Sequence, residues 1–81
     1  MEMAVMKELI PAIIERYRLD LHEAKFLHEM HREAIATQIS LTRKSWVNQY
    51  RAAPPLGILL EAAWEILDPH AFRMVVAQRR I

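Results

Sequence analysis

Two histidines in the first half of the chain have the type and spacing of paired metal ligands. His28 and His31 are three residues apart, so on a helix both imidazoles would project from one face and could bind the same ion. The neighbouring positions on that face, Ala24 and Ile35, cannot complete a tetrahedral site, and the motif HEMH is one residue shorter than the HExxH of zinc proteases. We therefore predict no metal ion and no cofactor. Both histidines are expected at a contact between helices, which protonation below about pH 6.5 would loosen.

The remaining side chains that could catalyse a reaction lack the partners that catalysis requires. The chain has no cysteine, and Ser40 and Ser45 suit a turn and a helix start better than a nucleophile. Glu61 and Glu65 are four residues apart, which is typical of a solvated acidic face of a helix. A glycine-rich phosphate loop is excluded because Gly57 is the only glycine. We therefore predict no catalytic residues and no enzyme activity.

One long helix is predicted to position these side chains. From Pro11 to about Ile39, apolar residues recur at spacings of three and four, which gathers them on one broad face. That face comprises Ile10, Ile13, Ile14, Tyr17, Leu21, Ala24, Ile35 and Ile39. A second apolar stripe, roughly opposite, comprises Leu19, Phe26 and Met30. Because a surface helix needs only one apolar side, this helix is expected to have neighbours on both sides and to be central to the fold.

Prolines and short polar residues predict where the other helices begin and end. A first short helix, residues 2–10, ends or kinks near Pro11, and Ser40–Thr42 supplies a turn and the next N-cap. Pro54-Pro55 stops a helix, and Asp68-Pro69 combines an N-cap carboxylate with a proline at the first helical position. The later helices are therefore predicted at about 43–52, 55–67 and 69–79.

The predicted fold class is all-α. We expect a compact bundle of four to five helices with one long central helix at about residues 11–39, forming a single domain over residues 1–81. Apolar residues make up 53% of the chain, somewhat more than the usual share of about 45–50%. A small monomer cannot easily hide this surplus, so self-association or a partner protein would explain it. A well-packed bundle without a partner is the alternative.

Charge is distributed unevenly, although the net charge is only +1. Residues 2–33 carry seven acids and five bases, whereas residues 34–60 carry no acid. That acid-free segment contains Arg43, Lys44 and Arg51, so it is predicted to form a local basic patch. No apolar run approaches the roughly 18 residues of a membrane helix, and the N-terminus lacks a basic signal region. We therefore expect no membrane association and a cytoplasmic location.

Residues 32–51, REAIATQISLTRKSWVNQYR, resemble the helix-turn-helix of Cro/CI-type phage and bacterial repressors. Ile35 and Ala36 match the apolar residue and alanine that precede the turn in that family. Ser40 matches the turn position, and Leu41 matches the apolar residue after it. The resemblance implies DNA binding by a recognition helix that begins near Thr42. The residues that would then face phosphates or base edges are Arg43, Lys44, Ser45, Asn48 and Arg51.

The sequence favours a non-catalytic protein–protein interaction module. We predict a small adaptor, chaperone or inhibitor of the bacterial or phage type, which binds itself or another protein through the long helix, most simply as a homodimer. The predicted interaction face comprises Ile14, Tyr17, Leu21, His28, Met30, His31 and Ile35. Leu21→Asp would release an oligomer if Leu21 lies in an interface, and would unfold the domain if it lies in the core. The alternative function is a helix-turn-helix DNA-binding transcriptional regulator.

Overall fold

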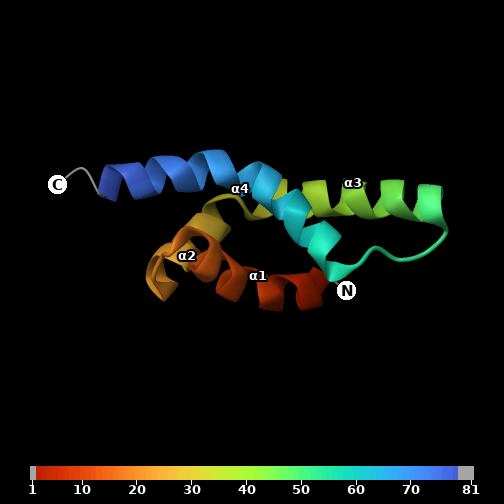
Figure 1. Cartoon of the computed structure of the whole chain (residues 1–81), viewed down its shortest axis with the longest axis horizontal. Helices are drawn as coiled ribbons and strands as arrows, with labels where there is room; N and C mark the ends of the chain where they lie inside the picture. The colour runs from red at the N-terminus through yellow and green to blue at the C-terminus, as the bar shows by residue number, and fades with distance from the viewer. Residues whose placement is uncertain (1, 79–81) are drawn as a thin grey trace.

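The computed structural model describes residues 2–78 as four helices joined by short connections (Figure 1). The helices are α1 (Glu2–Tyr17), α2 (Leu21–Met30), α3 (Arg32–Tyr50) and α4 (Leu56–Gln78). No strand occurs in this part of the chain, so the predictions of an all-α fold and of four to five helices are confirmed. The molecule measures 49 × 20 × 19 Å, and its elongated shape differs from the compact bundle that we expected.

α1 continues through Pro11 instead of ending there. Its buried side chains, Val5, Leu9 and Ile13, follow one another at intervals of four residues and face the core. Pro11 is exposed on the opposite side of the helix. Burial of the apolar stripe offsets the backbone hydrogen bond that proline cannot donate. Of the two possibilities that the sequence left open, a single helix is the one observed.

The predicted long helix from Pro11 to Ile39 is wrong, because the chain breaks twice within it. At the first break Arg18 has a φ of 55°, and the N–H of Leu19 donates to the carbonyl of Ile14 at 3.2 Å. This hydrogen bond across a left-handed residue is the pattern of a Schellman turn, which ends a helix. Leu19 is buried by the turn, so an apolar contact stabilises the break.

A capping box starts α2 directly after the first break. The N–H of Glu23 donates to the carboxylate of Asp20 at 2.8 Å, and the N–H of Asp20 donates to the carboxylate of Glu23 at 3.0 Å. The second break is a single residue, His31, whose φ of −117° and ψ of 15° separate α2 from α3. The apolar residues that suggested one helix therefore belong to three helices.

Two other predicted boundaries are absent from the structure. Ser40–Thr42, the predicted turn, lies inside α3, and Asp68-Pro69, the predicted helix start, lies inside α4. No glycine or proline interrupts Ser40–Thr42, so nothing in its backbone prevents a continuous helix. In α4, Leu67 and Ala71 are fully buried on either side of Pro69. This burial offsets the missing hydrogen bond of the proline.

The hydrophobic core lies where α1, α2 and the first half of α3 pack against α4. Its largest fully enclosed side chains are Leu9, Ile13, Leu27, Ile35, Ile39 and Leu67. α4 contacts each of the other three helices, and Figure 1 shows it crossing α3. The second half of α3 therefore contributes no buried side chain to this core.

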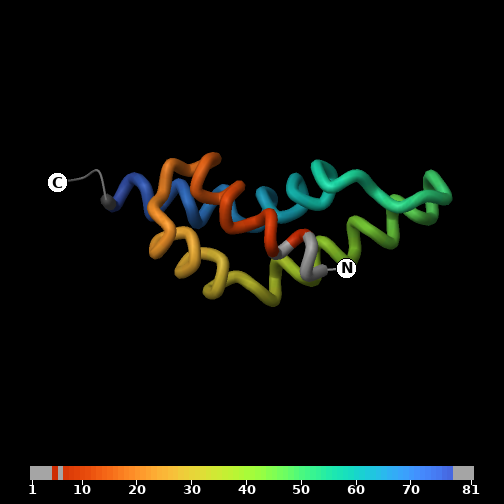
Figure 2. Tube along the Cα trace, turned by 90° about the horizontal axis from the view of Figure 1, so that it is seen from below, coloured from red at the N-terminus to blue at the C-terminus, as the bar shows by residue number. Residues whose placement is uncertain are grey.

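The second half of α3 and the start of α4 form an arm. We define the arm as residues 41–58 and the body as the other described residues, 2–40 and 59–78. α3 carries the chain away from the body, and residues 51–55 lead it back to α4 (Figures 1 and 2). Among the described side chains every buried residue lies in the body, and none lies in the arm. The arm is therefore held without core packing.

Candidate interaction surfaces

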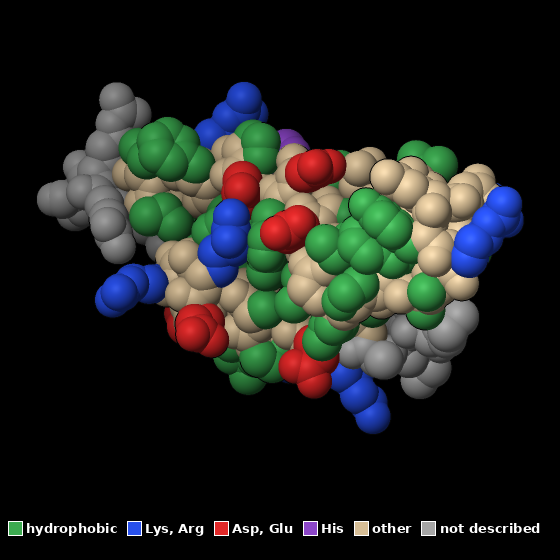
Figure 3. Space-filling view, turned by 45° about the vertical axis from the view of Figure 1, so that its right-hand side comes forward, with side chains coloured by type: hydrophobic (Ala, Val, Ile, Leu, Met, Phe, Trp, Pro, Cys, Tyr) green, Lys and Arg blue, Asp and Glu red, His purple; other side chains and the backbone are tan. Residues whose placement is uncertain are grey.

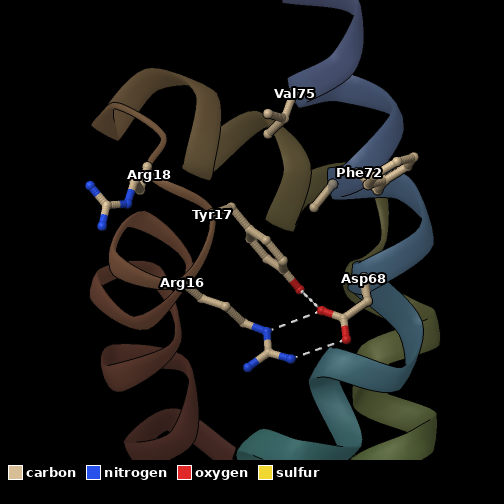
Figure 4. Close-up of a pocket in the computed structure, with 7 residues that line it drawn as sticks. Arg16, Tyr17, Arg18, Asp68, Phe72 and Val75 are labelled. Atoms are coloured by element: carbon tan, nitrogen blue, oxygen red, sulfur yellow. Dashed lines mark hydrogen bonds and ion pairs between the residues drawn. The ribbon is translucent and has the colours of Figure 1, made fainter.

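A polar cluster of three side chains joins the end of α1 to the middle of α4 (Figure 4). Arg16 donates from Nε and Nη2 to the two carboxylate oxygens of Asp68 at 3.0 and 3.1 Å, and the Tyr17 hydroxyl donates to the same carboxylate. The hydrogen bond from Arg16 holds the pKa of the Asp68 carboxyl below its usual value, although partial burial acts in the opposite direction. Burial of the phenol, followed by its hydrogen bond to Asp68, raises the pKa of Tyr17.

Aromatic contacts complete this cluster. The guanidinium of Arg16 lies 4.9 Å from the ring centre of Trp64, and the ring of Tyr17 meets Trp64 edge to face at 5.9 Å. An open groove of about 630 Å³ beside the cluster is lined by Arg16, Tyr17, Arg18, Asp68, Ala71, Phe72 and Val75. Figure 4 shows Arg18 pointing away from Asp68, while the three polar side chains of the cluster point toward one another. The cluster therefore holds α1 against α4.

Tyr17→Phe should lower the free energy of unfolding at pH 7 by about 0.5–1 kcal/mol, because Asp68 loses one of its donors. The pKa of Asp68 is lower in the folded protein, so this carboxylate stabilises the fold above its unfolded pKa of about 4 and loses that effect as the pH falls through its folded pKa. Urea unfolding at pH 7 and pH 3 would measure the difference, which should shrink in acid. Tyr50→Phe, on the exposed arm, is the control and should change neither value.

Two histidines from different parts of the chain stack on each other. His31 lies between α2 and α3, His70 lies on α4, and their ring centres are 3.9 Å apart with an angle of 17° between the planes. Burial, followed by the proximity of His70, lowers the pKa of His31. Burial also lowers the pKa of His28, which is half-buried. Within residues 2–78 no group of three His, Asp or Glu side chains could hold a metal ion.

The residues predicted as an interaction face differ in their burial. Leu21 and Met30 are 53% and 61% exposed, but Ile35 is fully enclosed in the core. Ile14 and Tyr17 are partly buried and pack against that core. The two breaks place these residues on three helices instead of one. Ile35 is a core residue and not an interface residue, whereas the role of the others stays a prediction.

One side of α3, from Gln38 at the edge of the body to Tyr50 in the arm, is lined by uncharged side chains. It forms a shallow depression of about 350 Å³ lined by Gln38, Leu41, Thr42, Ser45, Trp46, Gln49 and Tyr50, which we call the uncharged face. Leu41 is 57% exposed, and the ring of Tyr50 lies against Trp46 with the ring centres 4.3 Å apart. Aromatic and aliphatic groups among neutral polar side chains are typical of the centre of a protein–protein interface.

The opposite side of α3 in the arm carries its basic side chains. A second shallow depression, of about 380 Å³, is lined by Arg43, Lys44, Val47 and Asn48. Arg51, the left-handed C-cap residue of α3, follows Val47 by four positions, and its N–H donates to the carbonyl of Val47. We call these five residues the basic face. Figure 3, which brings this end of the molecule forward, shows acidic side chains over the body and none toward the end of the arm.

The helix-turn-helix resemblance predicted a turn that the structure lacks. Ser40 and Thr42 are helical residues within α3, so Arg43 and Lys44 belong to the same continuous helix as Ile35 and Ala36, and Arg51 is its C-cap. Of the five residues that the resemblance assigned to DNA, Ser45 lies on the uncharged face, apart from the others.

No family model, curated protein or solved structure matches this chain. No described helix is long and apolar enough to cross a membrane. The function must therefore be argued from the surfaces themselves.

Proposed function

We propose that the protein is a non-catalytic interaction module that self-associates through the uncharged face of its arm. The observation that carries this proposal is the absence of any buried side chain in residues 41–58. The large apolar side chains that the arm exposes are Leu41, Val47, Tyr50 and Leu56. Of these, Leu41 and Tyr50 lie together with Trp46 on the uncharged face, and a contiguous exposed apolar patch is typical of an interaction site.

A partner would stabilise the helical segment of the arm. A helical segment of about ten residues is marginally stable in water unless one side of it packs against other structure. The second half of α3 has about this length and contributes nothing to the core. Covering Leu41, Trp46 and Tyr50 would remove apolar surface from water, at about 25 cal/mol for each Å² buried. A partner on the uncharged face would therefore stabilise the arm itself.

A second copy of the chain suits the uncharged face. In a symmetric dimer each subunit presents the same patch to the other subunit. A charged side chain in the patch would therefore lie near the equivalent side chain of the partner and repel it. The side chains that line the uncharged face avoid this repulsion, and the nearby Glu65 carboxylate accepts a hydrogen bond from Gln38 at the edge of the face. A contact through the basic face would bring Arg43 and Lys44 of the two copies together. The proposed dimer therefore leaves both basic faces open to solvent. In this proposal the arm takes the role that we had predicted for the long helix.

Leu41→Glu should convert the proposed dimer to a monomer. A carboxylate at this position would be buried against its symmetry mate, and we expect the dissociation constant to rise about 100-fold or more. Sedimentation velocity over a range of micromolar concentrations would measure the change. The circular dichroism spectrum should remain that of the wild type, because Leu41 is exposed in the monomer and both residue types favour helix.

Leu21→Glu provides a matched control on the body. Leu21 is 53% exposed, close to the value of Leu41, but it lies on α2 away from the arm. This variant should associate like the wild type. A wild-type chain that stays monomeric at high micromolar concentration would refute the proposal, and dissociation by Leu21→Glu alone would move the interface to α2.

A further inference from the structure

We propose that the basic face of the arm binds an acidic amphipathic helix of a partner protein. This inference rests on the proposed interaction function and adds the chemistry of the partner. The basic face lies opposite the uncharged face on α3, so both could be occupied in one assembly. Its depression places one exposed apolar side chain, Val47, among basic and amide side chains.

The arm and the body differ in the sign of their net charge, which is positive on the arm and negative on the body. All ten acidic residues of the chain lie outside residues 34–60, and the three bases of that segment are Arg43, Lys44 and Arg51. The body carries ten acids and six bases. A negatively charged segment is therefore attracted to the arm and repelled by the body, which orients it before contact.

Val47 supplies the apolar contact that such a complex needs. Its side chain is 42% exposed and lines the depression together with Lys44 and Asn48. Ion pairs between exposed side chains contribute little to affinity on their own, because water and salt screen them. A helix with apolar residues at i, i+3, i+4 and i+7 and acids beside them would bury Val47 and pair with the surrounding bases.

A nucleic-acid duplex fits this surface less well. The basic face offers three positive charges, whereas proteins that bind DNA tightly contact about 6–10 phosphates. A duplex that extends beyond the arm would also lie beside the acid-rich body, which repels it. A helix of about 14 residues extends only about one turn beyond the part of α3 that lies in the arm, so most of its length lies over the basic face.

Fluorescence anisotropy with a designed peptide tests the inference. The probe is a fluorescein-labelled helical peptide of about 14 residues with Leu at i, i+3, i+4 and i+7 and with Glu and Ala elsewhere. We expect micromolar binding that weakens about tenfold when the salt concentration rises from about 50 to 500 mM. Val47→Ser should weaken it about fivefold, and the double variant Lys44→Ala with Arg51→Ala about tenfold.

Matched controls separate this face from general electrostatics. Lys25→Ala with Arg73→Ala removes two exposed bases of the body and should leave the peptide affinity unchanged. A peptide with Lys in place of Glu should not bind. The inference is overturned if the Glu peptide does not bind, if the body variant weakens it as much as the arm variant, or if a labelled random duplex binds more tightly than the peptide.

Sedimentation velocity on the same variants distinguishes this inference from the proposed self-association. Lys44→Ala with Arg51→Ala leaves the uncharged face intact, so the variant should associate like the wild type. Loss of peptide binding with association unchanged in this variant supports the inference. A wild type that associates without binding the peptide refutes only the inference, whereas a monomeric wild type that binds it refutes only the self-association.

Discussion

An Ile35→Asp variant should be unfolded at 25 °C and neutral pH. Ile35 is fully enclosed where α3 packs against α4, and no buried polar side chain in the described core could pair with a carboxylate. Loss of the isoleucine contacts costs about 2–5 kcal/mol, and burial of an unpaired charge adds several more. This total is comparable with the entire stability of a small domain, about 5–15 kcal/mol. Far-UV circular dichroism should show the loss of helix.

Leu21→Asp is the matched substitution at an exposed site. Leu21 is 53% exposed at the first position of α2, where a carboxylate interacts favourably with the positive end of the helix dipole. The variant should keep the wild-type spectrum and a thermal midpoint within a few degrees of the wild type. An unfolded Leu21→Asp, or a helical and cooperative Ile35→Asp, would contradict the placement of α2 and α3 around the core.

Local signals predicted much of the fold correctly. Pro54-Pro55 separates α3 from α4 as expected, because proline restricts its own backbone and that of the preceding residue. By their spacing Leu56, Leu59, Leu60, Ala63 and Leu67 share one helical face, of which the structure buries Leu59, Ala63 and Leu67 and leaves Leu56 42% exposed. These features depend only on neighbouring residues, so the sequence is sufficient to predict them.

The break between α1 and α2 was partly visible in the sequence. Asp20 and Glu23 have the spacing of a capping box, and the structure forms both of its hydrogen bonds. The left-handed residue before it is Arg18, where glycine or asparagine would have been the usual signal. The apolar residues keep a spacing of three and four across this break, because two short helices that pack against the same core can share one periodicity. Periodicity alone therefore joined separate helices.

Contacts between distant residues overrode the predicted boundary at Asp68. Its carboxylate could have capped a helix starting at Pro69, but it binds Arg16 and Tyr17 instead, more than 50 positions earlier in the chain. The same limit applies to His70, whose partner His31 lies on the other side of α3 in the sequence. Charge composition identified the basic residues of the arm, but the uncharged face depends on how far α3 extends beyond the core.

Lowering the pH from 7.5 to 5 should lower the thermal midpoint by about 5–10 °C. Burial and the neighbouring His70 lower the pKa of His31 in the folded protein, so the unfolded chain binds more protons below its own histidine pKa of about 6.5. The folded protein favours the neutral form of His31. Its free energy of unfolding is therefore unaffected above about pH 6.5 and falls below that pH, where the unfolded chain binds protons more readily. Because His31 is partly exposed, water screens this effect, so we expect a loss on the order of 1 kcal/mol, which corresponds to several degrees in the thermal midpoint.

His70→Gln should weaken this pH dependence, because the proximity of His70 is the second of the two causes that lower the pKa of His31. His22→Gln changes an exposed histidine on α2 and should retain the full effect. Asp68 does not contribute in this range, since its folded pKa is lowered from a value already below pH 5. A midpoint that is constant between pH 5 and 7.5 would contradict the argument. If the full dependence persists in His70→Gln, burial, which lowers the pKa of both His31 and His28, accounts for it instead.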